Sequence, residues 1–229
     1  MRLKMLKIAL ISLTALFTTV NTANASLIYD GNVTPSVFFG SGNSNGYFVI
    51  DSQNDIELGL RAKIPYQSTY NSNGDGTYSM DTGAHPKWGA PGAGWNFEFS
   101  INANVDGLGN EILGDFFYLL SIDMDPSLGL AWTSFNPVTT FTDNAIGNNG
   151  YSAQNSMNVG WLSLPFDSSI AGTYDFKLQA FSTQNQGLLA ETMMQVIVGG
   201  GGVATVPEPS TLALLSLAFL GLVSRRKVK

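Results

Sequence analysis

The stretch that decides the fold of this chain reads WNFEFSINANVD and spans residues 95–106. Apolar and polar side chains alternate in it without interruption. The apolar set is Trp95, Phe97, Phe99, Ile101, Ala103 and Val105, and the polar set is Asn96, Glu98, Ser100, Asn102, Asn104 and Asp106. Because successive side chains point to opposite faces of a β-strand, this period of two predicts a long strand with one buried and one solvated face.

Similar patterns follow this strand. After a turn at residues 106–110, alternate apolar side chains at residues 116–122 predict a second strand, which we expect to be the antiparallel partner of the first. Further on, residues 174–180 and 190–198 alternate in the same way on either side of a short polar loop at residues 182–187. These two segments predict a β-hairpin at the end of the domain.

Weaker strand patterns occur elsewhere, each bounded by Gly, Asn, Asp or Pro. They lie at residues 36–39, 47–51, 56–64 and 159–164. No segment of the body keeps the 3.6-residue period of an amphipathic helix for three turns. We therefore expect an all-β domain at residues 26–198, an antiparallel β-sandwich of the Ig-like or jelly-roll kind.

The composition excludes several kinds of chemistry. The chain has 229 residues, one histidine and no cysteine, so disulfides, thiol nucleophiles and cysteine-ligated zinc are excluded. Its formal net charge of −6 is unevenly distributed, because residues 26–206 hold sixteen acidic and four basic residues while most basic residues lie at the two ends. A body this acidic repels nucleic acid and suits divalent cations.

The N-terminus has the three parts of a secretory signal peptide at residues 1–25. Basic residues precede an apolar run at residues 8–20, and Ala23 and Ala25 stand at positions −3 and −1 relative to Ser26. Signal peptidase requires small side chains at those two positions. We therefore expect a signal peptidase to cleave before Ser26 and the body to be exported.

The C-terminus carries a second topology signal. A glycine-rich linker at residues 199–205 precedes a proline-flanked carboxylate, an apolar run at residues 211–223 and a basic tail. The proline-flanked motif is Val206, Pro207, Glu208, Pro209 and Ser210, and the basic tail contains Arg225, Arg226 and Lys227. The prolines hold the motif extended, and we expect a short hydrophobic helix after it. By the positive-inside rule the basic tail stays in the cytoplasm, which places the body outside.

Residues 206–229 resemble the PEP-CTERM sorting signal, in which a Pro-Glu-Pro motif, a hydrophobic helix and an Arg-rich end follow one another in this order. The same tail is also called an ice-binding protein C-terminal domain, a label that implies nothing about ice binding by the body. The resemblance implies that an exosortase sorts the chain, a membrane-embedded processing enzyme of Gram-negative bacteria associated with exopolysaccharide production. It also implies a precursor anchored transiently in the inner membrane and a product at the cell surface or outside the cell, in an extracellular matrix or biofilm.

Few residues of the body suggest catalysis. His85 is the only imidazole, and it lies in a loop sequence without a nucleophile elbow. A glycoside hydrolase would need a pair of carboxylates, and the candidates are Asp123 with Asp125, or Glu98 on the polar face of its strand. The two aspartates fit a turn or a cation site better, because like charges so close repel each other. We therefore expect a protein that is not an enzyme, with a carboxylate-dependent hydrolase as the third alternative.

Residues 71–77 resemble the first half of a calcium-binding loop. Asn71, Asn73 and Asp75 supply oxygen donors at positions 1, 3 and 5 of such a loop, which has glycine at position 6. The bidentate Glu of position 12 is absent, since Thr82 stands there. The sequence therefore predicts either a weak Ca²⁺ site or a plain polar turn, and no other cofactor.

Aromatic residues in polar, Asn-rich segments suggest a binding function. They are Tyr66, Tyr70, Tyr78, Trp88, Trp132, Tyr151 and Trp161. Such side chains either stack on sugars or cover the edge of a sandwich core. Our first hypothesis is a structural or adhesive surface protein, and the alternative is a carbohydrate-binding module that contacts exopolysaccharide, with or without calcium.

Overall fold

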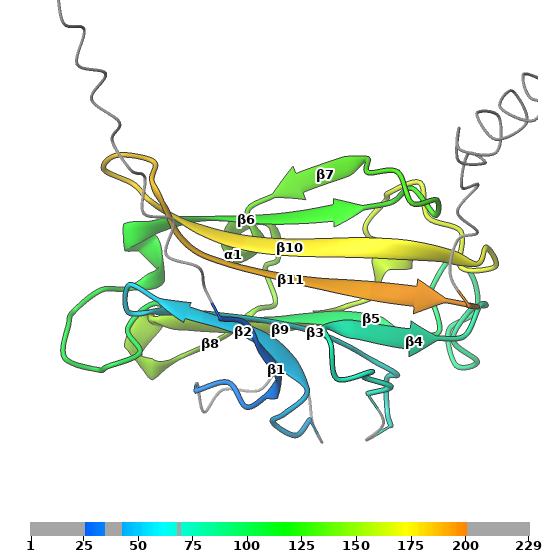
Figure 1. The fold of residues 1–229 in the computed structure, drawn as a ribbon, viewed down its shortest axis with the longest axis horizontal. Coiled ribbons are helices and arrows are strands. Elements are labelled where there is room, and N and C mark those ends of the chain that lie inside the picture. Colours follow the sequence, from blue (N-terminus) through cyan, green and yellow to red (C-terminus); the bar gives the residue numbers. More distant parts are fainter. Residues whose placement is uncertain (1–25, 35–42, 68–69, 201–229) are drawn as a thin grey trace, which may run out of the picture.

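Two packed β-sheets form the body of the protein in a computed structural model, which describes residues 26–34, 43–67 and 70–200 (Figure 1). Sheet A has six strands in the order β1-β2-β3-β5-β9-β8, and sheet B has five in the order β4-β11-β10-β6-β7. Neighbouring strands are antiparallel except β4 and β11, which are parallel. The expected all-β sandwich is confirmed.

The strands differ widely in length. Sheet A consists of β1 (Ile28–Gly31), β2 (Phe48–Gln53), β3 (Ile56–Lys63), β5 (Asn96–Asn102), β9 (Ser152–Met157) and β8 (Ala145–Gly147). Sheet B consists of β4 (Thr77–Met80), β11 (Leu188–Val198), β10 (Gly172–Ser182), β6 (Phe116–Asp123) and β7 (Trp132–Phe135). The connections hold four short helical turns, η1 (Leu113–Asp115), α1 (Pro137–Thr140), η2 (Asn148–Gly150) and η3 (Val159–Trp161). Across the described ranges, no helix is both long and apolar enough to cross a membrane.

The decisive stretch forms β5 in the interior of sheet A, and its apolar face lies in the core. The side chains of Trp95, Phe97, Phe99 and Ile101 are at most 1% exposed. The ring of Phe97 lies 5.2 Å from the ring of Phe176 on β10, centroid to centroid, and so joins the two sheets. Fully burying one such side chain contributes about 1.5–3 kcal/mol to stability, so this face alone commits the strand to the core.

The predicted hairpin at the end of the domain is confirmed. β10 and β11 pair from Gly172 opposite Val198 to Phe181 opposite Leu188, with a bulge near the turn. The alternate apolar side chains of both strands are buried as expected. They are Tyr174, Phe176, Leu178 and Ala180 on β10, and Ala190, Met194, Val196 and Val198 on β11.

The predicted pairing of residues 95–106 with residues 116–122 is wrong. β5 pairs with β3 and β9 in sheet A, whereas β6 pairs with β10 and β7 in sheet B. The turn at residues 106–110 therefore begins a crossover between sheets instead of a hairpin. Two strands that each have one apolar face can bury it side by side in one sheet or face to face in two, and alternation alone does not distinguish these arrangements.

The weaker strand patterns have mixed outcomes. Residues 47–51 and 56–64 form β2 and β3, but residues 159–164 contain the helical turn η3 in place of a strand, with the Asn158 side chain as its N-cap. Strand β9 was not predicted because its sequence, SAQNSM, has no apolar alternation. The predicted strand at residues 36–39 lies outside the described residues.

The polar face of β5 is buried as well, contrary to the expectation of a solvated face. Asn96, Glu98, Ser100 and Asn102 are all less than a tenth exposed, and Glu98 only 1%. A carboxylate so buried needs charged or hydrogen-bonding partners, because its desolvation costs several kcal/mol. The neighbouring strand β3 supplies them.

Two basic residues of β3 contact Glu98. The Arg61 guanidinium donates from Nε to Glu98 Oε2 at 2.5 Å, and the Lys63 ammonium lies 3.4 Å from Oε1. Arg61 is itself fully buried, with its guanidinium 4.2 Å from the Phe48 ring centroid and 4.4 Å from that of Tyr70. Sheet A therefore has an apolar layer on its inner face and a buried ionic layer on its outer face.

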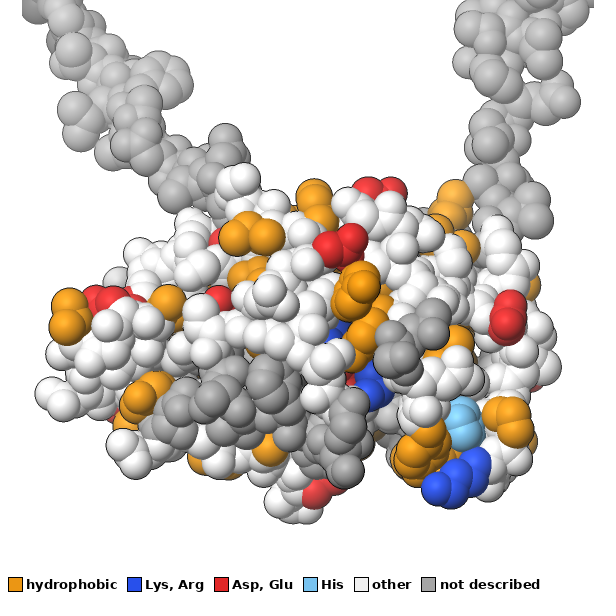
Figure 2. Space-filling view, turned by 90° about the horizontal axis from the view of Figure 1, so that it is seen from below, with side chains coloured by type: hydrophobic (Ala, Val, Ile, Leu, Met, Phe, Trp, Pro, Cys, Tyr) orange, Lys and Arg blue, Asp and Glu red, His pale blue; other side chains and the backbone are white. Residues whose placement is uncertain are grey.

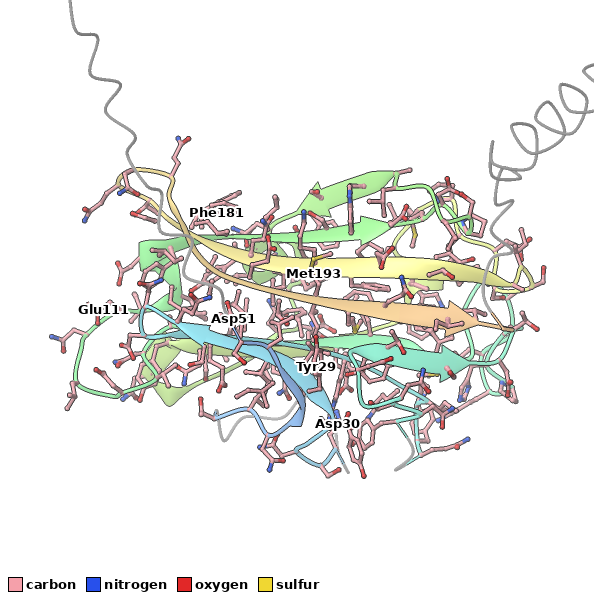
Figure 3. All side chains as sticks on the ribbon, viewed as in Figure 1. Tyr29, Asp30, Asp51, Glu111, Phe181 and Met193 are labelled. Carbon is pink, nitrogen blue, oxygen red and sulfur yellow. The ribbon has the colours of Figure 1, made fainter. Side chains whose placement is uncertain are left out.

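The two sheets are also joined along one edge, between β2 and β11. The carboxylate of Asp51 on β2, labelled in Figure 3, accepts a hydrogen bond from the backbone N–H of Glu191 at 2.8 Å. The hydroxyl of Thr192 donates to the Val49 carbonyl at 2.9 Å. This part of β11 lies beyond the four residues that pair with β4, so side chains replace the missing strand partner.

Candidate functional site

Four ring side chains meet at one end of the sandwich: Tyr66, His85, Trp88 and Trp161, which we call the aromatic cluster. Trp88 is central, with ring-centroid distances of 4.2 Å to His85, 4.8 Å to Trp161 and 5.8 Å to Tyr66. Tyr66 is 70% exposed and Trp161 is 51% exposed. The Lys87 ammonium lies 4.1 Å from the Tyr66 ring centroid, a cation–π contact. Figure 2 shows hydrophobic side chains gathered around the histidine and a basic side chain on this part of the surface.

A compact loop at residues 83–94 positions His85 and Trp88. The backbone N–H of His85 donates to the Gly92 carbonyl at 3.2 Å, and the N–H of Trp88 donates to the His85 carbonyl at 3.0 Å. The Nδ1 atom of His85 accepts from the backbone N–H of Lys87 at 3.2 Å. The imidazole is therefore held by its own loop, with its ring against Trp88.

The side chain of Asn158 attaches this loop to the helical turn that carries Trp161. Asn158 is fully buried, and its Oδ1 accepts from the backbone N–H groups of Ala93 at 2.8 Å and Gly160 at 3.1 Å. Its Nδ2 donates to the carbonyls of Ala93 at 2.9 Å and Trp95 at 3.0 Å. One amide thus satisfies backbone groups of both segments, and it fixes Trp161 relative to Trp88.

A glycine makes the close approach of these segments feasible. A Cβ atom on Gly160 would lie 1.9 Å from the carbonyl oxygen of Pro91, far inside van der Waals contact. Any other residue there would push η3 away from the loop and separate Trp161 from Trp88.

Lys87 is unusual in this acidic body. Of the four basic residues in the described ranges, Arg61 and Lys63 are buried beside Glu98, and Lys177 is half-buried over the Trp132 ring at 5.0 Å. Lys87 is therefore the exposed basic side chain of the described body, and it lies in the aromatic cluster.

The structure brings together three of the seven aromatic residues that the sequence singled out, those in the aromatic cluster. Of the others, Trp132 and Tyr151 are half-buried, and Tyr70 and Tyr78 are buried. The Tyr78 hydroxyl donates to the Tyr47 carbonyl at 2.5 Å, and burial raises the pKa of Tyr78. The fourth ring of the cluster is His85, for which the sequence suggests a loop residue or a catalytic base and no aromatic contact, although its place three residues before Trp88 is a signal for ring contact.

The predicted calcium loop is an exposed turn before β4. The Asp75 carboxylate accepts from the Thr77 hydroxyl at 2.7 Å and from the Thr77 backbone N–H at 3.0 Å, and these bonds lower the pKa of Asp75. Asn73 donates to the hydroxyls of Thr77 at 2.8 Å and Ser79 at 3.1 Å. The side chains at positions 3 and 5 of the loop thus bond to the following strand, and Asn71 contributes its carbonyl to the Ser79 N–H at 3.0 Å.

A carboxylate distant in sequence also reaches this turn. Asp30 of β1, labelled in Figure 3, accepts from the Ser72 hydroxyl at 2.5 Å. In the part of the chain that the structure describes, no three His, Cys, Asp or Glu side chains are arranged to hold a metal ion. A weak calcium site at Asn71, Asn73 and Asp75 stays a prediction.

The candidate catalytic groups lie in separate places. Glu98 is in the ionic layer of sheet A, whereas Asp123 ends β6 in sheet B. Asp123 is fully buried and its Oδ1 accepts from the backbone N–H of Asp125 at 3.0 Å, while Asp125 itself accepts from the Ser127 N–H at 2.9 Å. His85 belongs to the aromatic cluster. The two aspartates thus bond to backbone groups of their own loop.

Comparison with known families identifies the C-terminus. A model described as the PEP-CTERM protein-sorting motif matches residues 205–227. The chain carries a PEP-CTERM sorting motif. The motif makes the protein an exported exosortase substrate of a Gram-negative bacterium and implies transient anchoring at the membrane before it reaches the surface. The comparison with curated proteins found no match for the chain.

The PEP-CTERM motif and the predicted signal peptide lie outside the described residues. The residues concerned are Ala23 and Ala25 before the cleavage point, the motif at 206–210, and the basic tail with Arg225, Arg226 and Lys227. Their predicted roles come from the sequence and, for the C-terminal segment, from the family match.

Proposed function

We propose that the exported body is a non-enzymatic, polysaccharide-binding surface protein, which adheres to the exopolysaccharide of the extracellular matrix through the aromatic cluster. The observation that carries this proposal is the exposed ring surface of Tyr66 and Trp161 on either side of Trp88. Sugar rings stack their C–H faces on such aromatic rings, and their hydroxyls need polar groups nearby.

The construction of the cluster supports binding over core packing. His85 and Trp88 lie on a loop, and Trp161 follows on a helical turn that Asn158 and Gly160 fix to this loop, so little conformational entropy is lost at these three rings when a ligand binds. Lys87 adds a hydrogen-bond donor beside Tyr66. The PEP-CTERM motif supports the same conclusion, because the exosortase system is associated with exopolysaccharide production.

Affinity electrophoresis in gels that contain the host's own exopolysaccharide tests the binding. We expect the polysaccharide to retard the wild-type body, and Trp161→Ala to bind at least about tenfold more weakly, because one buried and stacked ring contributes about 1.5 kcal/mol or more. Tyr29→Ala is the matched control, since Tyr29 is a comparably exposed ring (46%) on β1, outside the cluster. Absence of retardation, or equal losses in both variants, would overturn the proposal.

The sorting step has a separate test. Deletion of Pro207, Glu208 and Pro209 should leave an unprocessed precursor in the membrane fraction, which mass spectrometry of the C-terminus would detect. Unchanged processing would contradict dependence on the motif while leaving the binding test unaffected.

A further inference from the structure

The end of β6 at Asp123 and the loop at residues 124–131, which joins β6 to β7 (Figure 1), have a feature that the aromatic cluster does not explain. Asp123 is fully buried, yet its Oδ2 atom has no hydrogen-bond partner among the residues that the structure describes. Both ion pairs of the described residues are made by Glu98, so Asp123 also has no basic partner there. A buried carboxylate oxygen without a donor is costly, and a proton, a water molecule or a cation must relieve that cost.

The Asp123 carboxylate lies between the two ends of this loop. Its Oδ1 accepts from the backbone N–H of Asp125 at 3.0 Å and from that of Ala131 at 2.8 Å, so it bridges the two ends of the loop. The loop is also fixed on its outer side, because the backbone N–H of Thr173 on β10 donates to the Pro126 carbonyl at 3.1 Å. The unpartnered Oδ2 belongs to the same carboxylate and is therefore held beside the two ends of the loop.

Oxygen donors recur at every second residue of this loop. The sequence from 123 to 129 places Asp, Asp, Ser and Gly at positions 123, 125, 127 and 129. The Asp125 Oδ2 and Ser127 Oγ atoms lie 3.1 Å and 3.2 Å from the point where a Cβ on Gly129 would be, so both oxygens gather on the same side of Gly129. The Ser127 Oγ atom also accepts a hydrogen bond from the backbone N–H of Gly129 at 3.0 Å. Carboxylate, hydroxyl and carbonyl oxygens are the ligands that calcium prefers, often at alternate residues of one loop.

From these observations we propose that residues 123–129 form a calcium site, with Asp123 Oδ2 as the buried ligand and Asp125 and Ser127 as further oxygen ligands. Two carboxylates neutralise the ion, and loop oxygens and water complete its coordination. With so few charged ligands the affinity falls in the millimolar range of extracellular calcium modules, which suits an exported acidic protein. The site is independent of polysaccharide binding by the aromatic cluster.

Thermal unfolding of the mature body, after treatment with EDTA, tests the site. For millimolar affinity, 10 mM Ca²⁺ should raise Tm by about 3–6 °C. Asp123→Asn should abolish this shift, because the amide keeps the Oδ1 acceptor but removes the charged ligand. Asp75→Asn is the matched control in the exposed turn at residues 71–77, and it should keep the shift.

Each other outcome contradicts the proposal. No shift of Tm in the wild-type body means that Asp123 binds no calcium ion. A shift that survives Asp123→Asn and disappears in Asp75→Asn assigns the ion to the exposed turn instead.

A second measurement covers the case in which Asp123→Asn fails to fold. Terbium, which replaces calcium at oxygen sites, should luminesce when tryptophan is excited, because Trp132 on β7 is the strand partner of Asp123. Trp132→Phe should reduce this luminescence severalfold, and Trp161→Phe should leave it nearly unchanged. Equal luminescence from wild type and Trp132→Phe would place the ion elsewhere.

Discussion

The two faces of β5 have opposite chemistry and the same burial. The inner face packs Phe97 and Phe99 into the sandwich core, whereas the outer face holds Glu98 in ion pairs with Arg61 and Lys63. Burial on the inner face is favourable in itself, but burial on the outer face is tolerated only because every charge has a partner. The comparison shows that alternation along a strand identifies its apolar face and its polar face. Alternation does not show whether the polar face is exposed to solvent.

The largest expected effect is on the inner face. Phe97→Ala should destabilise the body by about 3–5 kcal/mol, because it removes a fully buried ring and leaves a cavity beside Phe176. Urea unfolding followed by tryptophan fluorescence measures the loss. Ser100→Ala on the outer face is the control, since its buried hydroxyl has no hydrogen-bond partner in the described part of the chain and its removal should change stability by less than about 1 kcal/mol. Similar losses in both variants would contradict the distinction between the faces.

A smaller loss, about 3 kcal/mol, is expected from Glu98→Gln, because the Arg61 guanidinium would stay buried without an opposite charge. The double variant Arg61→Met with Glu98→Leu should be less destabilised than Glu98→Gln alone, since it leaves no unpaired charge at this pair. Urea unfolding of Arg61→Met, Glu98→Leu and the double variant completes a thermodynamic cycle. Additive losses would mean that the outer layer is not an ionic one.

The smallest effect has the opposite sign and concerns Glu57 on β3. Its Oε1 accepts from the backbone N–H of Thr34 at 2.7 Å and from the Thr34 hydroxyl at 2.9 Å, but burial dominates and raises the pKa of Glu57. The native state therefore binds a proton more tightly than the unfolded chain does. Stability falls as the pH rises from the unfolded-state pKa through the raised native-state pKa.

Glu57→Gln keeps the acceptor oxygen and removes the charge. It should equal or exceed the stability of the wild type by up to about 1 kcal/mol at pH 7, and this advantage should vanish below about pH 4, where Glu57 is protonated in both states. Urea unfolding at the two pH values measures it. At each pH, the measured quantity is the stability of Glu57→Gln minus that of the wild type. If this difference is lower at pH 7 than at pH 4, the hydrogen bonds to the Glu57 carboxylate outweigh its desolvation.

The sequence predicted part of the aromatic cluster: it singled out three of the residues but not their contact with one another. These three are aromatic residues in polar segments, namely Tyr66, Trp88 and Trp161. They are up to 95 positions apart, and nothing in the sequence indicates that their rings contact one another. Their meeting depends on Asn158, which had no distinguishing pattern, and on Gly160, one of 25 glycines. The sequence also could not predict that an oxygen of Asp123 is buried and unpartnered among the described residues. Burial of a carboxylate at a strand end depends on how the following loop folds over it.

The sequence by itself determined the all-β class, the inward face of β5, the closing hairpin and the PEP-CTERM motif, because these depend on local periodicity or on a contiguous motif. Only the tertiary structure decided which sheet each strand joins, that the polar face of β5 is buried, and which rings share one surface. The physical reason is that side-chain alternation fixes the direction of a residue relative to its own strand. The strands that pair with it, and the side chains that pack against it, depend on contacts between segments far apart in the chain. The sequence of one strand does not determine these contacts.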